Sequence, residues 1–334
     1  MTRFVLVLAI VASATCGPRV TPLLDLPKPT RDAGVGDDGG LDDAGVLAGL
    51  DCRPCDTWGP VQILAPLPMD LVELSGLSAS AAMPGVFYGH NDSGDSARLF
   101  AFSATGLLLA ELKLPGATAT DWEDMALGPC EGGGSCLFLA DIGDNLRRRG
   151  NYVIYRSREP DLRAVVSGAM QAPVQMELTF DRLPFVYPNG ERHNAETLLS
   201  HPVTGDLYIV TKAPGGTQSR VFRFPRPFTP GTTVTLIDLG DATVPAQGDS
   251  LVTGGDISPC GDAVIFRMYN RNVVLHAAPD AGFESAFTAM PLEAPVPIDE
   301  PQGEAIVWGL DGQSYFSASE GSGQSLHGVR CARP

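Results

Sequence analysis

Acidic residues open short apolar strands at similar places in four segments of this sequence. They are Asp124 in DWEDMALGP, Glu196 in NAETLLSHP, Asp256 in GGDISPCGD and Glu304 in QGEAIVWGLDG. A fifth segment, ELSGLSAS, has Gly76 in the same position. The five positions are 48, 72, 60 and 48 residues apart. A period in this range is typical of the blades of a β-propeller, whose innermost strands all begin around one central channel.

Carboxylates gathered at one end of such a channel would repel one another unless some of them take up protons or share a cation. Ca²⁺ suits this pattern because it accepts about six to eight oxygen ligands in a flexible arrangement. We therefore expect one axial Ca²⁺ held by Asp124, Glu196, Asp256 and Glu304. The simpler alternative is that these acidic residues only cap turns.

A second group of charged residues lies in and after ADIGDN. Asp141, Asp144 and Asn145 are close enough to form a second metal site or to support the first. The run Arg147, Arg148 and Arg149 follows on the same hairpin, where guanidinium groups beside a cation would bind phosphate or carboxylate. The simpler interpretation of this run is an exposed loop tip.

Two further cations, Lys212 and Arg267, occupy equivalent places on second strands. They would either bind an anion from the channel wall or neutralise the neighbouring carboxylates. The candidate general bases for a catalytic site are Asp124, Asp141 and Asp144.

The strand pattern predicts an all-β fold with five blades in residues 51–334. Short runs of β-branched and aromatic residues are separated by Gly, Pro, Asn and Asp. The last blade offers only three strands, so we expect residues 57–67 to supply its outer strand and close the ring. A short helix is expected near residues 161–170. Six blades are the alternative, if residues 174–192 form a divergent blade.

Seven cysteines are present, and six of them fall on the predicted face opposite the acidic positions. Cys130 and Cys136 flank a short glycine-rich loop and are expected to pair. Cys52 and Cys55 are expected to pair with Cys260 and Cys331, in an order that the sequence leaves open. Such disulfides are typical of proteins outside the cytoplasm.

The N-terminus resembles a signal peptide over residues 1–16, with Arg3 before the apolar run from Phe4 to Ala12. SATC at residues 13–16 predicts lipidation of Cys16, and cleavage after Ala14 is the alternative. Residues 17–50 are rich in Gly, Pro and Asp and predict a flexible acidic tether. The formal net charge of −16 argues against nucleic-acid partners and against direct binding to an anionic membrane.

With these blades, residues 70–334 resemble the calcium-activated nucleotidases, or soluble apyrases, and also bacterial phytase-like and esterase-like propeller proteins. The resemblance to the nucleotidases implies a five-bladed propeller with one Ca²⁺ on its axis. It implies ligands at Ser75 in ELSGL, Glu123 in DWED, Glu196 and Glu304. The chain departs from that pattern at Asp256, where Ser is expected, and in the extra carboxylate of Asp124.

We therefore expect a monomeric protein of the bacterial cell envelope, either anchored through its lipid or secreted. The expected function is recognition or scaffolding on the acidic face, with a small phosphorylated or carbohydrate ligand and an axial Ca²⁺. The alternative is a Ca²⁺-dependent phosphohydrolase of nucleotidase or phytase type.

Overall fold

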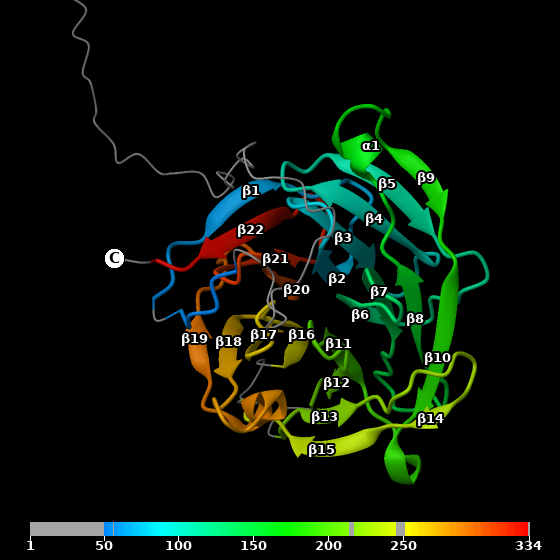
Figure 1. The fold of residues 1–334 in the computed structure, drawn as a ribbon, viewed down its shortest axis with the longest axis vertical. Coiled ribbons are helices and arrows are strands. Elements are labelled where there is room, and N and C mark those ends of the chain that lie inside the picture. Colours follow the sequence, from blue (N-terminus) through cyan, green and yellow to red (C-terminus); the bar gives the residue numbers. More distant parts are fainter. Residues whose placement is uncertain (1–49, 56, 214–216, 245–250, 333–334) are drawn as a thin grey trace, which may run out of the picture. The chain divides into compact units, whose positions relative to one another are not determined.

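The computed structural model describes residues 50–55, 57–213, 217–244 and 251–332, which form five mainly antiparallel β-sheets arranged in a ring (Figure 1). The predicted signal peptide, Cys16 and all of the tether except residue 50 lie outside the described residues. Each sheet is one blade, and its innermost strand lies nearest the ring axis. The predicted all-β, five-bladed architecture is confirmed.

The five blades follow one another along the chain, each starting with its innermost strand. Blade one contains β2 (Leu74–Ala79), β3 (Val86–Asn91), β4 (Arg98–Ser103) and β5 (Leu108–Lys113). Blade two contains β6 (Trp122–Pro129), β7 (Ser135–Asp141), β8 (Tyr152–Arg158) and β10 (Phe180–Val186). Blade three contains β11 (Ala195–Ser200), β12 (Leu207–Thr211), β13 (Arg220–Arg223) and β15 (Ile237–Asp241). Blade four contains β16 (Val252–Ile257), β17 (Ala263–Met268), β18 (Arg271–His276) and β19 (Leu292–Ala294).

Blade five consists of β20 (Gly303–Trp308), β21 (Ser314–Ser319), β22 (Ser325–Arg330) and the N-terminal strand β1 (Gln62–Pro66). β1 pairs antiparallel with β22, from Gln62 opposite Gly328 to Pro66 opposite Ser325. The expected closing strand is therefore confirmed. Because the first and last parts of the described chain share one sheet, this blade has its full complement of strands.

Two short strands reinforce the outer edges of blades one and two. β9 (Val174–Glu177) pairs in parallel with β5, and β14 (Val234–Thr235) pairs in parallel with β10. The six-bladed alternative is wrong, because residues 174–186 extend two existing sheets. Within the residues that the structure describes, helical structure is limited to α1 (Arg163–Val166), which lies in the expected range, and the 3-10 turns η1 (Pro188–Gly190) and η2 (Phe283–Thr288).

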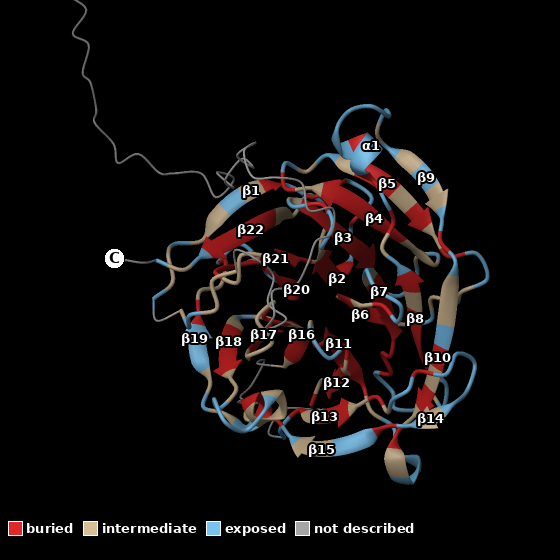
Figure 2. Cartoon of the chain, in the orientation of Figure 1, coloured by how far each residue is buried: buried red, intermediate tan, exposed pale blue. Residues whose placement is uncertain are grey.

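The described residues form five hydrophobic core clusters, one in each space between neighbouring blades. Leu137 and Tyr155 of blade two pack with Leu99 and Leu112 of blade one, for example. The other clusters fill the spaces between blades two and three, three and four, four and five, and five and one. Figure 2 shows the innermost strands almost wholly buried and the outer edges exposed. This core holds the five innermost strands rigidly around the axis.

Three disulfides join the described residues: Cys52–Cys260, Cys55–Cys331 and Cys130–Cys136. The Cys130–Cys136 pair is confirmed, and the structure settles the order of the other two. Cys130 and Cys136 close the β6–β7 turn, while Cys260 lies in the β16–β17 turn. These turns lie at the ends of the innermost strands opposite to the acidic strand starts, as predicted.

Candidate functional site

One residue near the start of every innermost strand is skipped in the pairing with the second strand. The register shifts between residues 74 and 76, 122 and 124, 195 and 197, 252 and 254, and 303 and 305. The skipped residues, here called the bulge residues, are Ser75, Glu123, Glu196, Thr253 and Glu304. A bulge leaves its residue unpaired and redirects its side chain, and bulges recur next to functional sites.

In three blades the structurally equivalent position therefore differs from the one that the repeated sequence pattern indicated. Ser75 takes the place assigned to Gly76, Glu123 that of Asp124, and Thr253 that of Asp256. The Thr253 hydroxyl donates a hydrogen bond of 2.9 Å to the carbonyl of Gly303 in the next blade. Ser75 donates in the same way to the carbonyl of Glu123. Thr253 was missed because a threonine inside a strand looks ordinary.

A second ring lies beside the bulge residues, at the residue that directly follows each second strand. Its members are Asp92, Ile142, Lys212, Tyr269 and Glu320. In four blades the backbone N–H of this residue donates to the carbonyl two residues before the bulge, as between Asp92 and Glu73 at 2.8 Å. The two rings together form one end of the channel, which we call the acidic mouth.

Three carboxylates meet on one side of the acidic mouth. Ligand oxygens of Asp92, Asp121 and Glu123 all lie within 4.8 Å of one another, so they could hold a metal ion. A Cβ added to Gly143 would lie 2.0 Å from Glu123 Oε1 and 2.5 Å from Asp121 Oδ2. These two carboxylates therefore rest directly on a glycine backbone, and a side chain there would displace them.

The carboxyl groups of this cluster are held in their neutral form more strongly than usual. Burial raises the pKa of Glu123 well above its ordinary value, and the negative charges of Glu196, Asp92 and Asp121 raise it further. Burial, with the charge of Asp92, raises the pKa of Asp121 to about 6. Burial also raises the pKa of Asp92. Crowded acids without enough positive charge respond in this way.

Glu304 and Glu320 form a second acidic pair in the acidic mouth. Burial and a hydrogen bond with Glu320 raise the pKa of Glu304 to about 9. The pKa of Glu320 is also raised, first by burial. With both pKa values raised, this pair takes up a proton more readily than two isolated carboxyl groups would.

Lys212 is the cation of this site. Its Nζ lies 3.1 Å from Glu196 Oε2 and donates to the Tyr269 hydroxyl at 2.8 Å. Burial alone would lower the pKa of Lys212, but Glu196 and Tyr269 raise it on balance, so the amine stays charged. Asn194 fixes the other oxygen of Glu196 with a hydrogen bond of 2.7 Å. The ammonium of Lys212 is paired directly with Glu196, and five further carboxyl groups belong to the acidic mouth: Asp92, Asp121, Glu123, Glu304 and Glu320.

Asp124 and Asp256 are not brought into this group. Asp124 accepts the N–H of Met125 at 2.8 Å and that of Leu198, in the next blade, at 3.0 Å. Asp256 accepts the N–H of Ile257 and that of Trp308, in the next blade, both at 2.9 Å. Trp308 is four residues after Glu304, so Asp256 lies roughly 13 Å further along the strands. Both carboxylates tie neighbouring inner strands together.

Burial governs the protonation of these two interstrand carboxyl groups as well. It raises the pKa of Asp124 well above its ordinary value, although the N–H donors of the neighbouring strands oppose it. It raises the pKa of Asp256 to about 7.

Asp141 and Asp144 are used to fold the β7–β8 hairpin. Asp141 accepts the N–H groups of residues 120 and 121 and pairs with Arg149 at 2.6 Å. Asp144 accepts the N–H groups of Arg148 and Arg149, each at 2.8 Å, and the hydroxyl of Tyr152. Burial opposes these donors, which nevertheless lower the pKa of Asp144 on balance. Asn145 accepts a hydrogen bond from Asn194 at 3.1 Å.

Only part of the arginine run is available to a ligand. Arg147 and Arg148 are exposed, whereas Arg149 is held by Asp141 and by the carbonyl of Gly143 at 2.6 Å. Arg267 is fully buried and pairs with Glu300 at 2.8 Å. Glu300 and the mouth residues Asp92, Asp121, Tyr269 and Glu320 are not predicted from the sequence, because nothing in their spacing marks the individual side chains.

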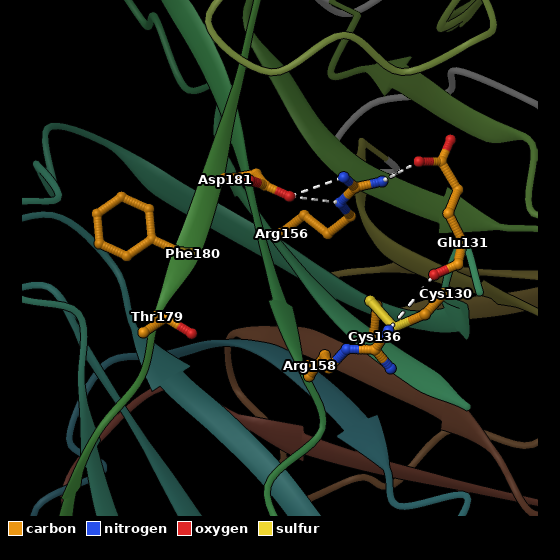
Figure 3. A pocket seen from close by; sticks show the side chains of 8 residues that line it. All are labelled: Cys130, Glu131, Cys136, Arg156, Arg158, Thr179, Phe180 and Asp181. Carbon is orange, nitrogen blue, oxygen red and sulfur yellow. Dashed lines mark hydrogen bonds and ion pairs between the residues drawn. A yellow bond between two sulfur atoms is a disulfide. The ribbon is translucent and has the colours of Figure 1, made fainter. Parts of the chain in front are cut away.

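A different cavity, of about 300 Å³, lies against blade two beside the Cys130–Cys136 disulfide. Figure 3 shows Arg156 between Asp181 and Glu131, with distances of 2.7 and 3.4 Å in the two ion pairs. Arg158 donates to the carbonyls of Gly133 and Glu131. Since both guanidinium groups are already partnered, this cavity is a weaker candidate than the acidic mouth.

No protein-family model matches the chain, and no curated protein matches its sequence. Solved structures do resemble it. An auxiliary nutrient binding protein from Bacteroides thetaiotaomicron has a TM-score of 0.44 and 10% identity, over 80% of this chain and 75% of that protein. A gluconolactonase from Xanthomonas campestris has a TM-score of 0.43 and 13% identity, over 84% of this chain and 99% of that enzyme. The resemblance to calcium-activated nucleotidases stays a hypothesis.

Within the described ranges, no helix is long and apolar enough to cross a membrane.

Proposed function

We propose that this protein is an exported binding protein whose acidic mouth holds a Ca²⁺ ion and, with it, a small carbohydrate or phosphorylated ligand. The observation that supports the proposal most is the meeting of Asp92, Asp121 and Glu123 within 4.8 Å. A divalent cation would relieve the repulsion that raises their pKa values, because Ca²⁺ prefers carboxylate oxygens. The bulge hydroxyls of Ser75 and Thr253 and the carboxylate of Glu196 line the same ring.

The metal site proposed here is displaced from the one expected from sequence. It retains Glu123, which the family resemblance implies as a ligand, and adds Asp92 and Asp121, while Glu196 is shared with Lys212. Asp124 and Asp256 stay outside it, because their oxygens accept backbone N–H groups. Lys212 and the exposed Arg147 and Arg148 would provide the positive charge for a phosphate or carboxylate of the ligand.

Binding is favoured over hydrolysis by the state of the candidate bases. Asp141 and Asp144 each accept at least three hydrogen bonds from protein groups. Asp124 is buried with an exposed fraction of 1%. A general base needs an oxygen within reach of the attacking water. Activity as a Ca²⁺-dependent phosphohydrolase is the alternative function, and Asp121 would then be the base to test.

Export and lipid anchoring at Cys16 belong to the same proposal. The three disulfides support it, since such bonds persist mainly in oxidising compartments.

The proposal is tested by calcium titration of the metal-stripped protein, followed by calorimetry and thermal unfolding. We expect one Ca²⁺ per chain and a melting temperature that rises with Ca²⁺, since a ligand at about one hundred times its Kd stabilises the native state by about 2.7 kcal/mol. Glu123→Gln and Gly143→Ala should abolish the heat of binding. Glu177→Gln, an exposed carboxylate on the outer strand β9, is the matched control and should bind normally.

No heat and an unchanged melting temperature in the wild-type protein would refute the metal site. If Ca²⁺ binds, a panel of sugars and sugar phosphates is then titrated with and without it, and at least one should bind only in its presence. A phosphate-release assay on the same panel separates the alternatives. Release that requires Ca²⁺ and is lost in Asp121→Asn would replace binding by hydrolysis.

A further inference from the structure

A cavity of about 390 Å³ lies at the end of the channel opposite the acidic mouth. All five blades contribute to its wall through the last part of their innermost strands. The contributing residues are Ala79 of β2, Leu127 of β6, Ser200 of β11, Ile257 of β16 and Val307 of β20. Its volume is typical of sites for small molecules. It is separate from the calcium site proposed above.

The wall of this cavity is mainly apolar and contains a single charged side chain. Leu127, Val203, Val307 and Leu310 provide apolar surface, and Asp256 is the one ionisable acid or base among the lining residues that the structure describes. A carboxylate in such surroundings favours a ligand of opposite charge.

The Asp256 carboxylate is held in place by two hydrogen bonds and can still accept more. Its Oδ1 accepts the N–H of Ile257 and its Oδ2 the N–H of Trp308, so each oxygen keeps a free acceptor position. Its side chain is half-buried, unlike the fully buried Asp124. The backbone contacts to two neighbouring strands therefore present the carboxylate to the cavity in a defined orientation.

One other polar group of the wall, Ser200 Oγ, has no hydrogen-bond partner among the described residues. Ser200 is buried, with an exposed fraction of 2%, and its hydroxyl oxygen can accept a hydrogen bond from an ammonium. Buried polar atoms without partners are rare and call for an explanation, and a ligand that supplies the missing partner is one.

We propose that this cavity binds a small organic cation that carries a primary ammonium group on an apolar alkyl or aryl body. The ammonium donates three hydrogen bonds, and the free acceptor positions of Asp256 and the Ser200 hydroxyl receive them. The apolar body lies against Leu127, Val307 and the neighbouring apolar residues. A neutral ligand would leave the Asp256 carboxylate without a counter-charge, and an anion would be repelled.

The test is a calorimetric titration of the whole domain at pH 8 with three probes of similar size: 2-phenylethylammonium, 2-phenylethanol and 3-phenylpropionate. We expect the ammonium to bind about tenfold or more tightly than the alcohol, because a charge-assisted hydrogen bond is lost in the latter. The carboxylate should not bind. Equal binding of ammonium and alcohol, or no heat from millimolar ammonium, would overturn the proposal.

Two variants locate the site. Asp256→Asn should weaken binding of the ammonium about tenfold or more and leave that of the alcohol unchanged. Leu127→Trp fills the cavity, retains Asp256 and should abolish binding, so the proposal stays testable if Asp256→Asn folds poorly. Asp161→Asn, an exposed acid near α1, is the control and should bind as the wild type does. Full binding by a folded Leu127→Trp variant would show that the probe binds elsewhere.

Discussion

Glu300→Gln should destabilise the propeller more than any exposed acidic substitution. Glu300 and Arg267 are both fully buried, and Arg267 Nη2 lies 2.8 Å from Glu300 Oε2. Glu300 Oε1 also accepts hydrogen bonds from Ser317 at 2.9 Å and from His327 at 2.7 Å. The guanidinium is tightly enclosed, since a Cβ on Gly303 would lie 1.6 Å from Arg267 Nη2. It has no route to solvent when its partner loses charge.

The expected cost follows from that enclosure. Removing one partner of a buried ion pair leaves an uncompensated charge and typically costs about 3–5 kcal/mol. For a domain of this size that corresponds to a fall in melting temperature of roughly 6–10 °C. Thermal unfolding and urea titration measure it, with Glu293→Gln as the control. Glu293 also pairs with an arginine, but it is exposed, so its loss should cost about 1 kcal/mol or less.

A double variant distinguishes the charge effect from a packing effect. Arg267→Met combined with Glu300→Gln removes the orphaned guanidinium, so it should be more stable than Glu300→Gln alone. If Glu300→Gln costs less than about 1 kcal/mol, or if the double variant is the less stable of the two, the reasoning about the buried pair is wrong.

Two further predictions concern pH and the closing strand. Burial alone would lower the pKa of His327, but Glu300 and Asp299 raise it above its ordinary value. The stability that this imidazole contributes is therefore complete below pH 6.5 and is lost as the pH rises through the raised pKa. The difference in unfolding free energy between wild type and His327→Gln should accordingly shrink from pH 6 to pH 9. A difference that stays constant over this range would contradict the prediction. Deleting residues 1–50 should leave the domain soluble, whereas deleting residues 1–68 removes β1, exposes β22 and should give insoluble protein. Cooperative thermal unfolding of the shorter chain would show that β1 is dispensable.

The blade organisation could be predicted because it depends on repeated local patterns. Each blade repeats strands and turns at a similar interval, and the three-stranded last blade called for a strand from residues 57–67. The disulfide Cys130–Cys136 followed from its short loop. The outer strands were harder to predict: residues 174–186 look like one long strand, yet they divide into β9 and β10 in different sheets. Their pairing depends on neighbours far away in sequence.

The register of the innermost strands could not be predicted, and the site depends on it. The segment DWED contains three acidic residues among its four, at the start of β6. Only the hydrogen-bond pattern of the strand shows that Glu123 is the bulge residue and Asp124 is not. A shift of one residue moves a side chain to the other face of its strand. Asp92 and Glu320 belong to the site because the second strand of each blade ends beside the bulge of the first. This proximity arises from strand pairing in the fold and is not visible in the sequence. Lys212 was identified together with Arg267 as a cation at a second strand, but the structure places Tyr269, not Arg267, at the position equivalent to Lys212.

Asp124 and Asp256 gain a clear role once they are separated from the acidic mouth. Each accepts the backbone N–H of the following blade's innermost strand, and neither has a cation at its side in the described part of the chain. Asp124 lies wholly buried between the acidic mouth and the opposite cavity, close enough to the N–H of Gly255 for that group to lower its pKa. The N–H groups around it are donors that would otherwise lack partners at the axis. The carboxyl group of Asp124 therefore ties neighbouring innermost strands together between the two ends of the channel.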